Sequence, residues 1–105
     1  MNITIKSQKN IAVAEISGEI DHHSAKELRT ELDSYIITFQ PELLIIDLSD
    51  VSFMDSSGVG LIIGRQKLIR QFGGNTEVKN PRPHIKRLLQ LAGVEKTVRI
   101  KNKEE

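Results

Sequence analysis

One run of residues decides the fold: Leu43-Leu44-Ile45-Ile46-Asp47-Leu48. It is nearly continuous apolar sequence, which is expected of a central strand that helices bury on both faces. A strand with one face in water would instead alternate apolar and polar residues. The run therefore predicts a parallel or mixed sheet covered by helices.

A hairpin of two short strands is predicted before this run. Apolar residues alternate with polar ones from Ile3, and again from Ile11, as expected for strands. The cluster Ser7-Gln8-Lys9-Asn10 separates the two stretches and contains residues that favour turns. We expect Gly18 to close the second strand.

Three amphipathic helices are predicted, because apolar residues recur every three or four positions in three stretches. These stretches are 25–39, 59–72 and 83–92. Ser24 with Glu27 three residues later fits a capping box at the start of the first helix, and Pro41 follows its end. Gly73-Gly74 stops the second helix, and Pro83 suits the first turn of the third.

Two weaker strands complete the expected order. Thr76 to Lys79 is a polar strand candidate. Val98 and Ile100 indicate a last short strand, and the residues after it, 101–105, are expected to fray. The elements then run β-β-α-β-α-β-α-β, which is typical of an α/β protein with a mixed sheet and a hairpin at its start.

Length and composition limit the classes of function. A chain of 105 residues is expected to form one domain over 1–105. Its 15 Lys and Arg nearly balance 14 Asp and Glu, so a net charge of +1 gives no broad basic face for nucleic acid. There is no cysteine for a disulfide or a thiolate metal site. No apolar run approaches the roughly 18 residues that span a bilayer. We therefore expect a cytoplasmic protein without membrane or direct nucleic-acid partners.

The densest group of functional side chains lies in 47–60, which includes Asp55-Ser56-Ser57-Gly58 and joins the central strand to the second helix. Sites in α/β sheets gather at such carboxyl ends of strands. Asp55 or Ser56 can simply cap the helix, while glycines at 58, 60 and 64 allow close approach to the sheet. A serine hydroxyl here is also well placed to carry a phosphate, because the amides and dipole of a helix start favour an anion. Both interpretations are open from the residues alone.

Three other chemistries fit this segment less well. The spacing Gly58-x-Gly60-x-x-x-Gly64 differs from that of a dinucleotide-binding loop. Ser56 lacks the glycine two positions before it that a hydrolase elbow requires. The acids Asp47, Asp50 and Asp55 are similar to those of a receiver domain, but the first strand ends without paired metal-binding carboxylates. A small phospho-accepting receiver-like domain is thus a weaker alternative.

A second polar segment precedes the first helix: Gly18-Glu19-Ile20-Asp21-His22-His23-Ser24. The tandem histidines suggest a metal site, but adjacent residues that enter a helix point in different directions. Solvated loop histidines are favoured, with Asp21 as a turn or cap residue, so we expect no metal and no bound cofactor. The basic stretches 65–70 and 84–87 are interpreted as solvated helix faces that can steer an acidic partner.

Together these segments carry a resemblance to a known family. The chain resembles the STAS-domain anti-sigma factor antagonists, and looks closest to the anti-sigma F factor antagonists of endospore-forming bacteria. The motifs that carry the resemblance are Gly18-Glu19-Ile20-Asp21-His22-His23, Phe53-Met54-Asp55-Ser56-Ser57-Gly58-Val59-Gly60 with Gly64-Arg65, Gly73-Gly74, and Ile85-Lys86-Arg87-Leu88-Leu89 up to Gly93.

The resemblance implies a STAS-like fold and a switch without catalytic residues. In this family the unphosphorylated protein binds an anti-sigma factor and frees the sigma factor, and phosphorylation turns binding off. The phosphoacceptor is the serine directly after the motif aspartate, which here is Ser56, with Ser57 as the adjacent competitor. The implied partners are an anti-sigma factor that is a serine kinase and carries ATP, and a metal-dependent serine phosphatase.

The resemblance also implies a docking surface beside the phosphoacceptor. Its expected partner-binding residues are Gly18, Glu19, Asp21, His22, His23, Asp55, Ser57, Gly58 and Gly60. The alternative within the family is a STAS module of a stress-response or other partner-switching system.

Overall fold

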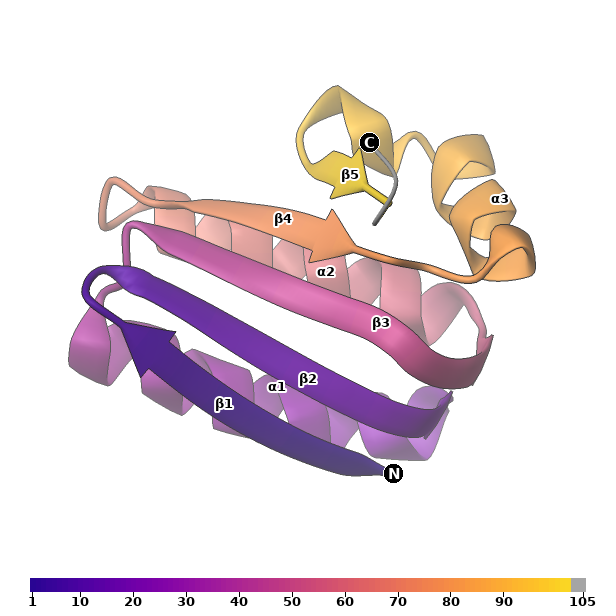
Figure 1. Ribbon diagram of the computed structural model, residues 1–105, viewed down its shortest axis with the longest axis horizontal. Helices are drawn as coiled ribbons and strands as arrows, with labels where there is room; N and C mark the ends of the chain where they lie inside the picture. Colours follow the sequence, from indigo (N-terminus) through magenta and orange to yellow (C-terminus); the bar gives the residue numbers. More distant parts are fainter. Residues whose placement is uncertain (103–105) are drawn as a thin grey trace.

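The computed structural model describes residues 1–102, which form one five-stranded mixed sheet with three α-helices (Figure 1). Strand order in the sheet follows chain order, from β1 to β5. The first two strands are antiparallel and all other neighbours are parallel. The elements are β1 (Asn2–Gln8), β2 (Ile11–Ile20), α1 (His22–Phe39), β3 (Leu43–Met54), α2 (Ser56–Arg70), β4 (Asn75–Lys79), α3 (Pro83–Leu91), the short 3-10 helix η1 (Val94–Lys96) and β5 (Arg99–Lys101). The predicted α/β order is confirmed.

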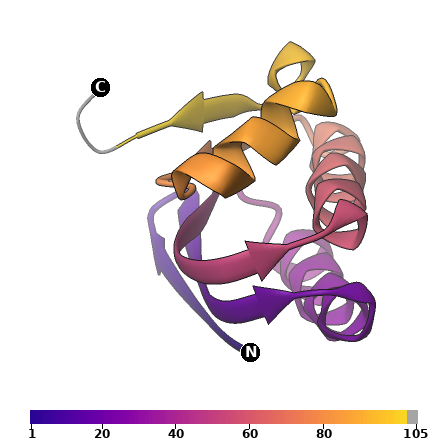
Figure 2. The ribbon, with the colours of Figure 1, turned by 90° about the vertical axis from the view of Figure 1, so that its right-hand side faces the viewer.

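The core lies between the sheet and helices α1 and α2, which Figure 2 shows on one side of the sheet. Alternate β3 side chains point toward these helices and are fully buried: Leu44, Ile46 and Leu48. The prediction that helices cover both faces of β3 is wrong, because Leu43 and Ile45 on the opposite face are only half-buried. Their apolar character has another reason: β3 is the middle strand, and Val13 of β2 lies beside Ile45 on that face.

Two strands run further than predicted. β2 continues past Gly18 to Ile20, and β3 continues to Met54 as its parallel partner. Gly18 has a φ of 98°, and the register shifts directly after it, so this glycine marks an irregularity within β2 rather than its end. The two extensions bring the polar segments 18–24 and 55–60 to the same end of the sheet.

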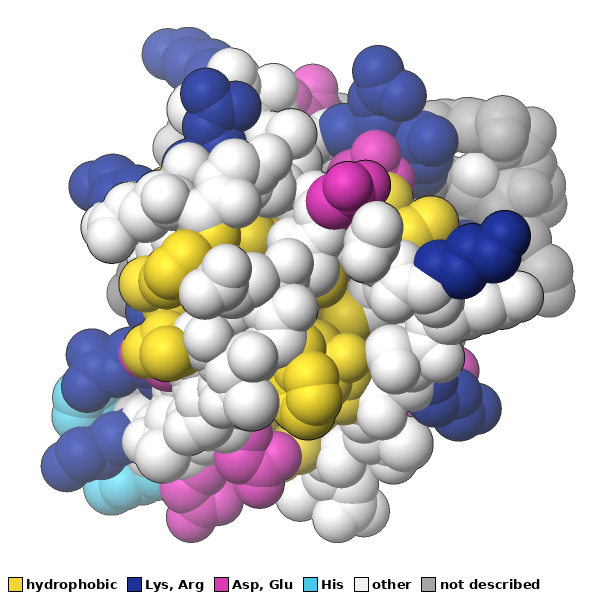
Figure 3. All heavy atoms as spheres, turned by 90° about the vertical axis from the view of Figure 1, so that its left-hand side faces the viewer, with side chains coloured by type: hydrophobic (Ala, Val, Ile, Leu, Met, Phe, Trp, Pro, Cys, Tyr) yellow, Lys and Arg dark blue, Asp and Glu magenta, His cyan; other side chains and the backbone are white. Residues whose placement is uncertain are grey.

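The opposite end of the molecule carries exposed apolar side chains. Figure 3 views this end and shows hydrophobic surface in separate patches among polar atoms. Exposed apolar residues near this end are Ile11, Ile37, Phe39 and Phe72. The Phe39 ring centroid lies 4.7 Å from that of Tyr35, so part of this surface packs on itself.

The carboxyl-terminal part differs from the prediction in detail. The 3-10 helix η1 precedes β5, and Val98 lies before that strand rather than in it. Lys101, predicted to fray, pairs with Lys79 at the end of β5. Asn102, also predicted to fray, accepts a hydrogen bond of 2.8 Å from Lys86 Nζ. The rest of the predicted tail, 103–105, lies outside the described residues. Within residues 1–102, none of the helices is long and apolar enough to cross a membrane.

Candidate functional site

The candidate site lies where β2 and β3 end side by side and lead into α1 and α2 (Figure 2). Ile20 pairs with Met54 as the last residues of the two strands. One residue later, the Asp55 amide donates a hydrogen bond of 3.2 Å to the Ile20 carbonyl. The two helices therefore begin next to each other, and the two segments singled out from the sequence form one surface.

At the start of α2, Asp55 is the cap and Ser56 is the first helical residue. The Ser57 amide donates to Asp55 Oδ1 at 2.8 Å, and the Gly58 amide donates to the Asp55 carbonyl at 3.0 Å. The side chain of Ser56 is exposed, and its hydroxyl takes part in none of the hydrogen bonds found among residues 1–102. The sequence placed the helix start after Gly58, at Val59. The helix begins three residues earlier, at Ser56, so both serines lie in its first turn.

Only one of the three glycines in α2 is required by packing. A Cβ on Gly58 would meet the Met54 side chain at 2.3 Å from Cγ and 2.7 Å from Sδ, so Gly58 lets the helix start close to the end of β3. A Cβ on Gly60 or Gly64 would meet nothing within 4 Å. The expectation that all three allow close approach to the sheet is therefore correct for Gly58 alone.

At the start of α1, Asp21 is the cap and Ser24 completes a capping box. Asp21 Oδ1 accepts from the amides of His23 and Ser24, both at 3.0 Å, and Ser24 Oγ accepts from the Asp21 amide at 2.9 Å. The predicted box of Ser24 with Glu27 is wrong, because an aspartate three residues earlier takes the cap position. Hydrogen bonding from the Ser24 amide lowers the pKa of Asp21, so its carboxylate is charged at neutral pH.

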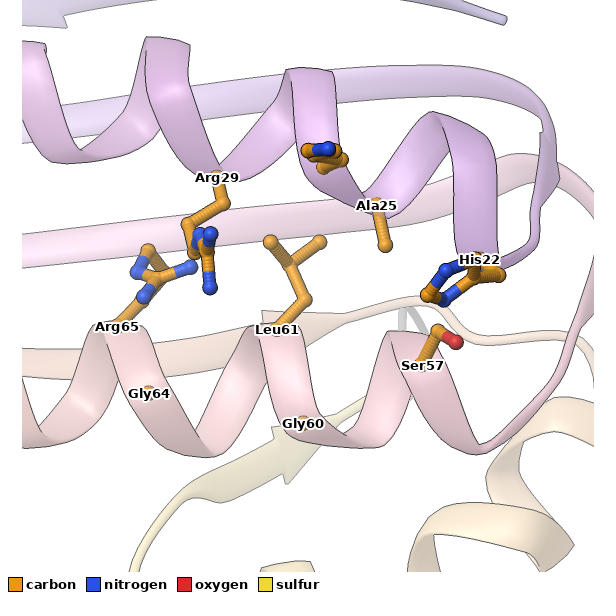
Figure 4. A pocket seen from close by; sticks show the side chains of 9 residues that line it. His22, Ala25, Arg29, Ser57, Gly60, Leu61, Gly64 and Arg65 are labelled. Carbon is orange, nitrogen blue, oxygen red and sulfur yellow. The ribbon is translucent and has the colours of Figure 1, made fainter.

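Two hollows with different charged side chains lie on either side of the α1 start. One, of about 570 Å³, contains three acidic side chains and the amino-terminal residue, and is lined by Met1, Gly18, Glu19, Asp21, His23, Ser24, Glu27 and Ser52. The other, of about 470 Å³, runs between α1 and α2 and contains basic residues: His22, Ala25, Lys26, Arg29, Ser57, Gly60, Leu61, Gly64 and Arg65 (Figure 4). His22 and His23 thus face different surroundings, as expected for adjacent residues that enter a helix.

The predicted docking residues all lie at this end, on both helix starts and the end of β2. Glu19, His22, His23 and Gly60 are exposed, whereas Gly18, Asp21, Asp55 and Ser57 are half-buried and Gly58 is buried. The exposed residues therefore offer more surface for contact than the half-buried and buried ones. Within residues 1–102, no group of three or more His, Asp or Glu side chains is arranged to hold a metal ion.

Sequence reasoning missed two contributors to this surface. Phe53, directly before Met54 in β3, has 46% of its surface exposed, which makes it an apolar contact point near the phosphoacceptor candidate. Arg65 is only 7% exposed, so the prediction of a solvated basic face over 65–70 is wrong for this residue. The available signal was its position: Arg65 falls four residues after Leu61, on the same buried stripe of α2.

The fold and the paired helix starts define a small α/β domain with an exposed serine at a helix start. Comparison with protein families matches the STAS domain over residues 2–105, and the chain belongs to this family. Among curated relatives, the anti-sigma F factor antagonist of Paenibacillus polymyxa is 36% identical over 104 residues, which are 99% of this chain and 89% of the relative. The anti-sigma-B factor antagonist of Bacillus subtilis is 34% identical over 105 residues, 100% of this chain and 94% of the relative.

Solved structures agree with this assignment. The unphosphorylated form of the anti-sigma factor antagonist SpoIIAA is similar with a TM-score of 0.84 and 28% identity, over 98% of this chain and 90% of that chain. SpoIIAA of Bacillus in its phosphorylated form gives a TM-score of 0.76 and 28% identity, over 98% of this chain and 94% of that chain. The same architecture therefore occurs in a protein with a phosphorylated and an unphosphorylated state.

Proposed function

We propose that this protein is an anti-sigma factor antagonist that works by partner switching. Its unphosphorylated form binds an anti-sigma factor and frees the sigma factor, and phosphorylation of Ser56 turns this binding off. The observation that carries the proposal is the exposed Ser56 hydroxyl, free of hydrogen bonds among residues 1–102, at the first position of α2. The names of the relatives, and the two states of SpoIIAA, support it.

Ser56 is favoured over Ser57 by exposure and direction. Ser56 is exposed, whereas Ser57 is half-buried and lines the groove between α1 and α2, where its side chain faces His22 (Figure 4). A kinase must bring the γ-phosphorus of its nucleotide in line with the attacking hydroxyl, which requires open approach from solvent. Ser56 meets that requirement without movement of α1.

Charge at this position explains release without refolding. A phosphoserine adds about −1.5 to −2 charges at pH 7. The amides and dipole of the first turn of α2 tolerate an anion, so the domain can keep its fold. A partner docked over Ser56 would have to desolvate that anion next to Asp55. A hundredfold loss of affinity needs only about 2.7 kcal/mol, which is below the cost of burying an unmatched charge.

The docking surface in this proposal combines the end of β2 with both helix starts. Exposed Glu19 and the charged Asp21 supply negative potential on one side, and Phe53 supplies apolar area. A basic surface on the anti-sigma factor would complement this side. The partner carries the ATP as a serine kinase, and a metal-dependent serine phosphatase restores the unphosphorylated form. This chain itself then needs no cofactor and performs no catalysis.

A second candidate is an antagonist in a stress-response system. It is favoured by the Bacillus subtilis anti-sigma-B relative, whose 34% identity covers the whole chain, against 36% for the anti-sigma F relative. Both candidates use the same surface and the same serine. Titration against anti-sigma F and anti-sigma-B factors in parallel separates them, because the cognate partner should bind much more tightly.

The test of the proposed function is incubation with a candidate anti-sigma kinase and ATP, followed by mass-spectrometric localisation of the phosphate. Wild type and Ser57→Ala should each take up one phosphate on Ser56, and Ser56→Ala should take up none. Stoichiometric labelling of Ser56→Ala would refute the residue assignment. Phosphate that is labile to hydroxylamine would indicate an acyl phosphate on an aspartate and so favour the receiver-like alternative.

A further inference from the structure

The groove between α1 and α2 has features that the proposed switch does not use. It extends along both helices from Ser57 to Arg65 and has a volume of about 470 Å³. Figure 4 shows side chains of the two helices directed into it from opposite walls. Its size lies in the range of small-ligand sites, which is about 300 to 1,000 Å³.

The lining of this groove is cationic. Lys26 and Arg29 come from α1, Arg65 comes from α2, and His22 stands at the end near Ser57. No acidic side chain is among the lining residues. In Figure 4 the guanidinium groups of Arg29 and Arg65 approach each other across the groove. Two like charges that converge in this way repel each other unless an anion lies between them.

Arg65 is a buried cation whose donors are only partly matched. It is only 7% exposed, and its Nε lies 2.8 Å from Asp33 Oδ1. Its Nη1 is buried without a hydrogen-bond partner among residues 1–102, and the contact of Nε with Asp33 is an ion pair without the geometry of a hydrogen bond. Burial is the main cause that lowers the pKa of this guanidinium; Asp33 acts in the opposite direction, and the neighbouring charge of Arg29 adds a smaller lowering. Arginine nevertheless stays protonated, so this buried cation has the Asp33 carboxylate on one side and an unpartnered Nη1 on the other.

The floor of the groove is kept open at a cost to helix stability. Gly60 and Gly64 lie one turn apart on α2, and a Cβ at either position would meet nothing within 4 Å. Alanine would therefore fit at both positions, and each glycine weakens the helix by up to about 1 kcal/mol relative to alanine. Leu61 and Ala25 add an apolar floor between the charges. Open space beside convergent cations is the arrangement of a ligand site.

We propose that the α1/α2 groove binds a small oxyanion with two or more negative charges, of the pyrophosphate class. The forks of Arg29 and Arg65 would hold its oxygens in paired hydrogen bonds, with the unpaired Nη1 of Arg65 as one donor and Lys26 as a further cation. Such a ligand would lie on one side of α1, and the acidic hollow at Glu19 lies on the other side. The site goes beyond the proposed switch and does not depend on phosphorylation of Ser56.

Isothermal titration calorimetry with sodium pyrophosphate, at constant ionic strength, tests this site on the purified protein. Wild type should bind one pyrophosphate per chain, and the amide NMR signals of Gly60 and Gly64 should shift. Arg29→Gln removes an exposed charge from the groove and should weaken binding about tenfold or more. The matched control Arg87→Gln removes one positive charge from the exposed face of α3, outside the groove, and should change the affinity for pyrophosphate less than about twofold.

A second variant tests the space rather than the charge. Gly64→Leu adds a side chain to the groove at a position where a Cβ meets nothing within 4 Å, so pyrophosphate affinity should fall about tenfold while the thermal unfolding midpoint is unchanged or higher. The site is refuted if wild type gives no saturable binding at millimolar pyrophosphate. It is also refuted if Arg87→Gln weakens binding as much as Arg29→Gln, or if Gly64→Leu binds like wild type.

Discussion

The two helix starts at the functional end are built from similar residues but use them differently. Each begins after an aspartate cap, Asp21 for α1 and Asp55 for α2. At the third helical position α1 has Ser24, whose hydroxyl bonds back to the cap, whereas α2 has Gly58. In α2 the serines stand at the first and second helical positions, which a capping box does not use, and the Ser56 hydroxyl is free of hydrogen bonds among residues 1–102. The position of a serine relative to its cap therefore decides whether the hydroxyl stabilises the helix or is available for modification.

The largest expected effect comes from copying the α1 arrangement into α2. Gly58→Ser would supply the missing capping residue, but its Cβ would lie 2.3 Å from Met54 Cγ. We expect a loss of about 1 to 3 kcal/mol in unfolding free energy, as for overpacked cores, in place of the gain that a new cap would give. Urea unfolding measures this change.

The control for that variant is Gly60→Ala two residues along, where the new Cβ meets nothing within 4 Å. It should raise the unfolding free energy by up to about 1 kcal/mol. A stabilised Gly58→Ser would show that Met54 yields easily, and that contact with β3 is not what excludes a capping box from α2.

The reverse change makes α1 resemble α2. Ser24→Gly removes the hydroxyl that accepts from the Asp21 amide at 2.9 Å and donates to the Glu19 carbonyl at 2.9 Å. We expect a loss of about 1 to 2 kcal/mol in unfolding free energy, from the cap and from the glycine. Phosphorylation by the kinase should proceed at the wild-type extent once the variant is folded. Loss of phosphate uptake in a folded Ser24→Gly would place this serine in the reaction rather than in the cap.

The smallest effect is the pH dependence of the α1 cap. The pKa of Asp21 lies below its ordinary value of 3.8 in the folded protein, because the Ser24 amide bonds to the carboxylate. A lowered folded pKa stabilises the protein above the unfolded pKa, and this contribution disappears as the pH falls through the folded value. The difference in unfolding midpoint between wild type and Asp21→Asn should therefore be largest near neutral pH and shrink below 3.8. A difference that is constant with pH would contradict this origin.

The sequence predicted the element order because helical and strand periodicities are local properties of the chain. It could not predict where β2 ends. A glycine such as Gly18, which here has a positive φ, suggests the end of a strand, but pairing with β3 continues β2 beyond it. The cap of α1 was misplaced for a similar reason: Asp21 and Ser24 both favour the cap, and only the backbone geometry selects Asp21.

The site was predicted in part. Ser56 and the loop from Gly18 came from motif resemblance, and the structure adds that they meet at the ends of paired strands. The groove could not be found from charge patterning, because Arg65 looks like one of several solvated cations until its burial is known. The local sequence also does not show that Arg29 of α1 lines the same groove as Arg65 of α2.

The most direct test of the account is the affinity of the protein for its anti-sigma factor before and after modification at Ser56. Fully phosphorylated and unphosphorylated protein should be titrated against the same partner, and their circular dichroism compared. The account predicts a loss of affinity of about a hundredfold or more with superimposable spectra, because charge at an exposed hydroxyl blocks docking without refolding. Equal affinities of the two forms would contradict it.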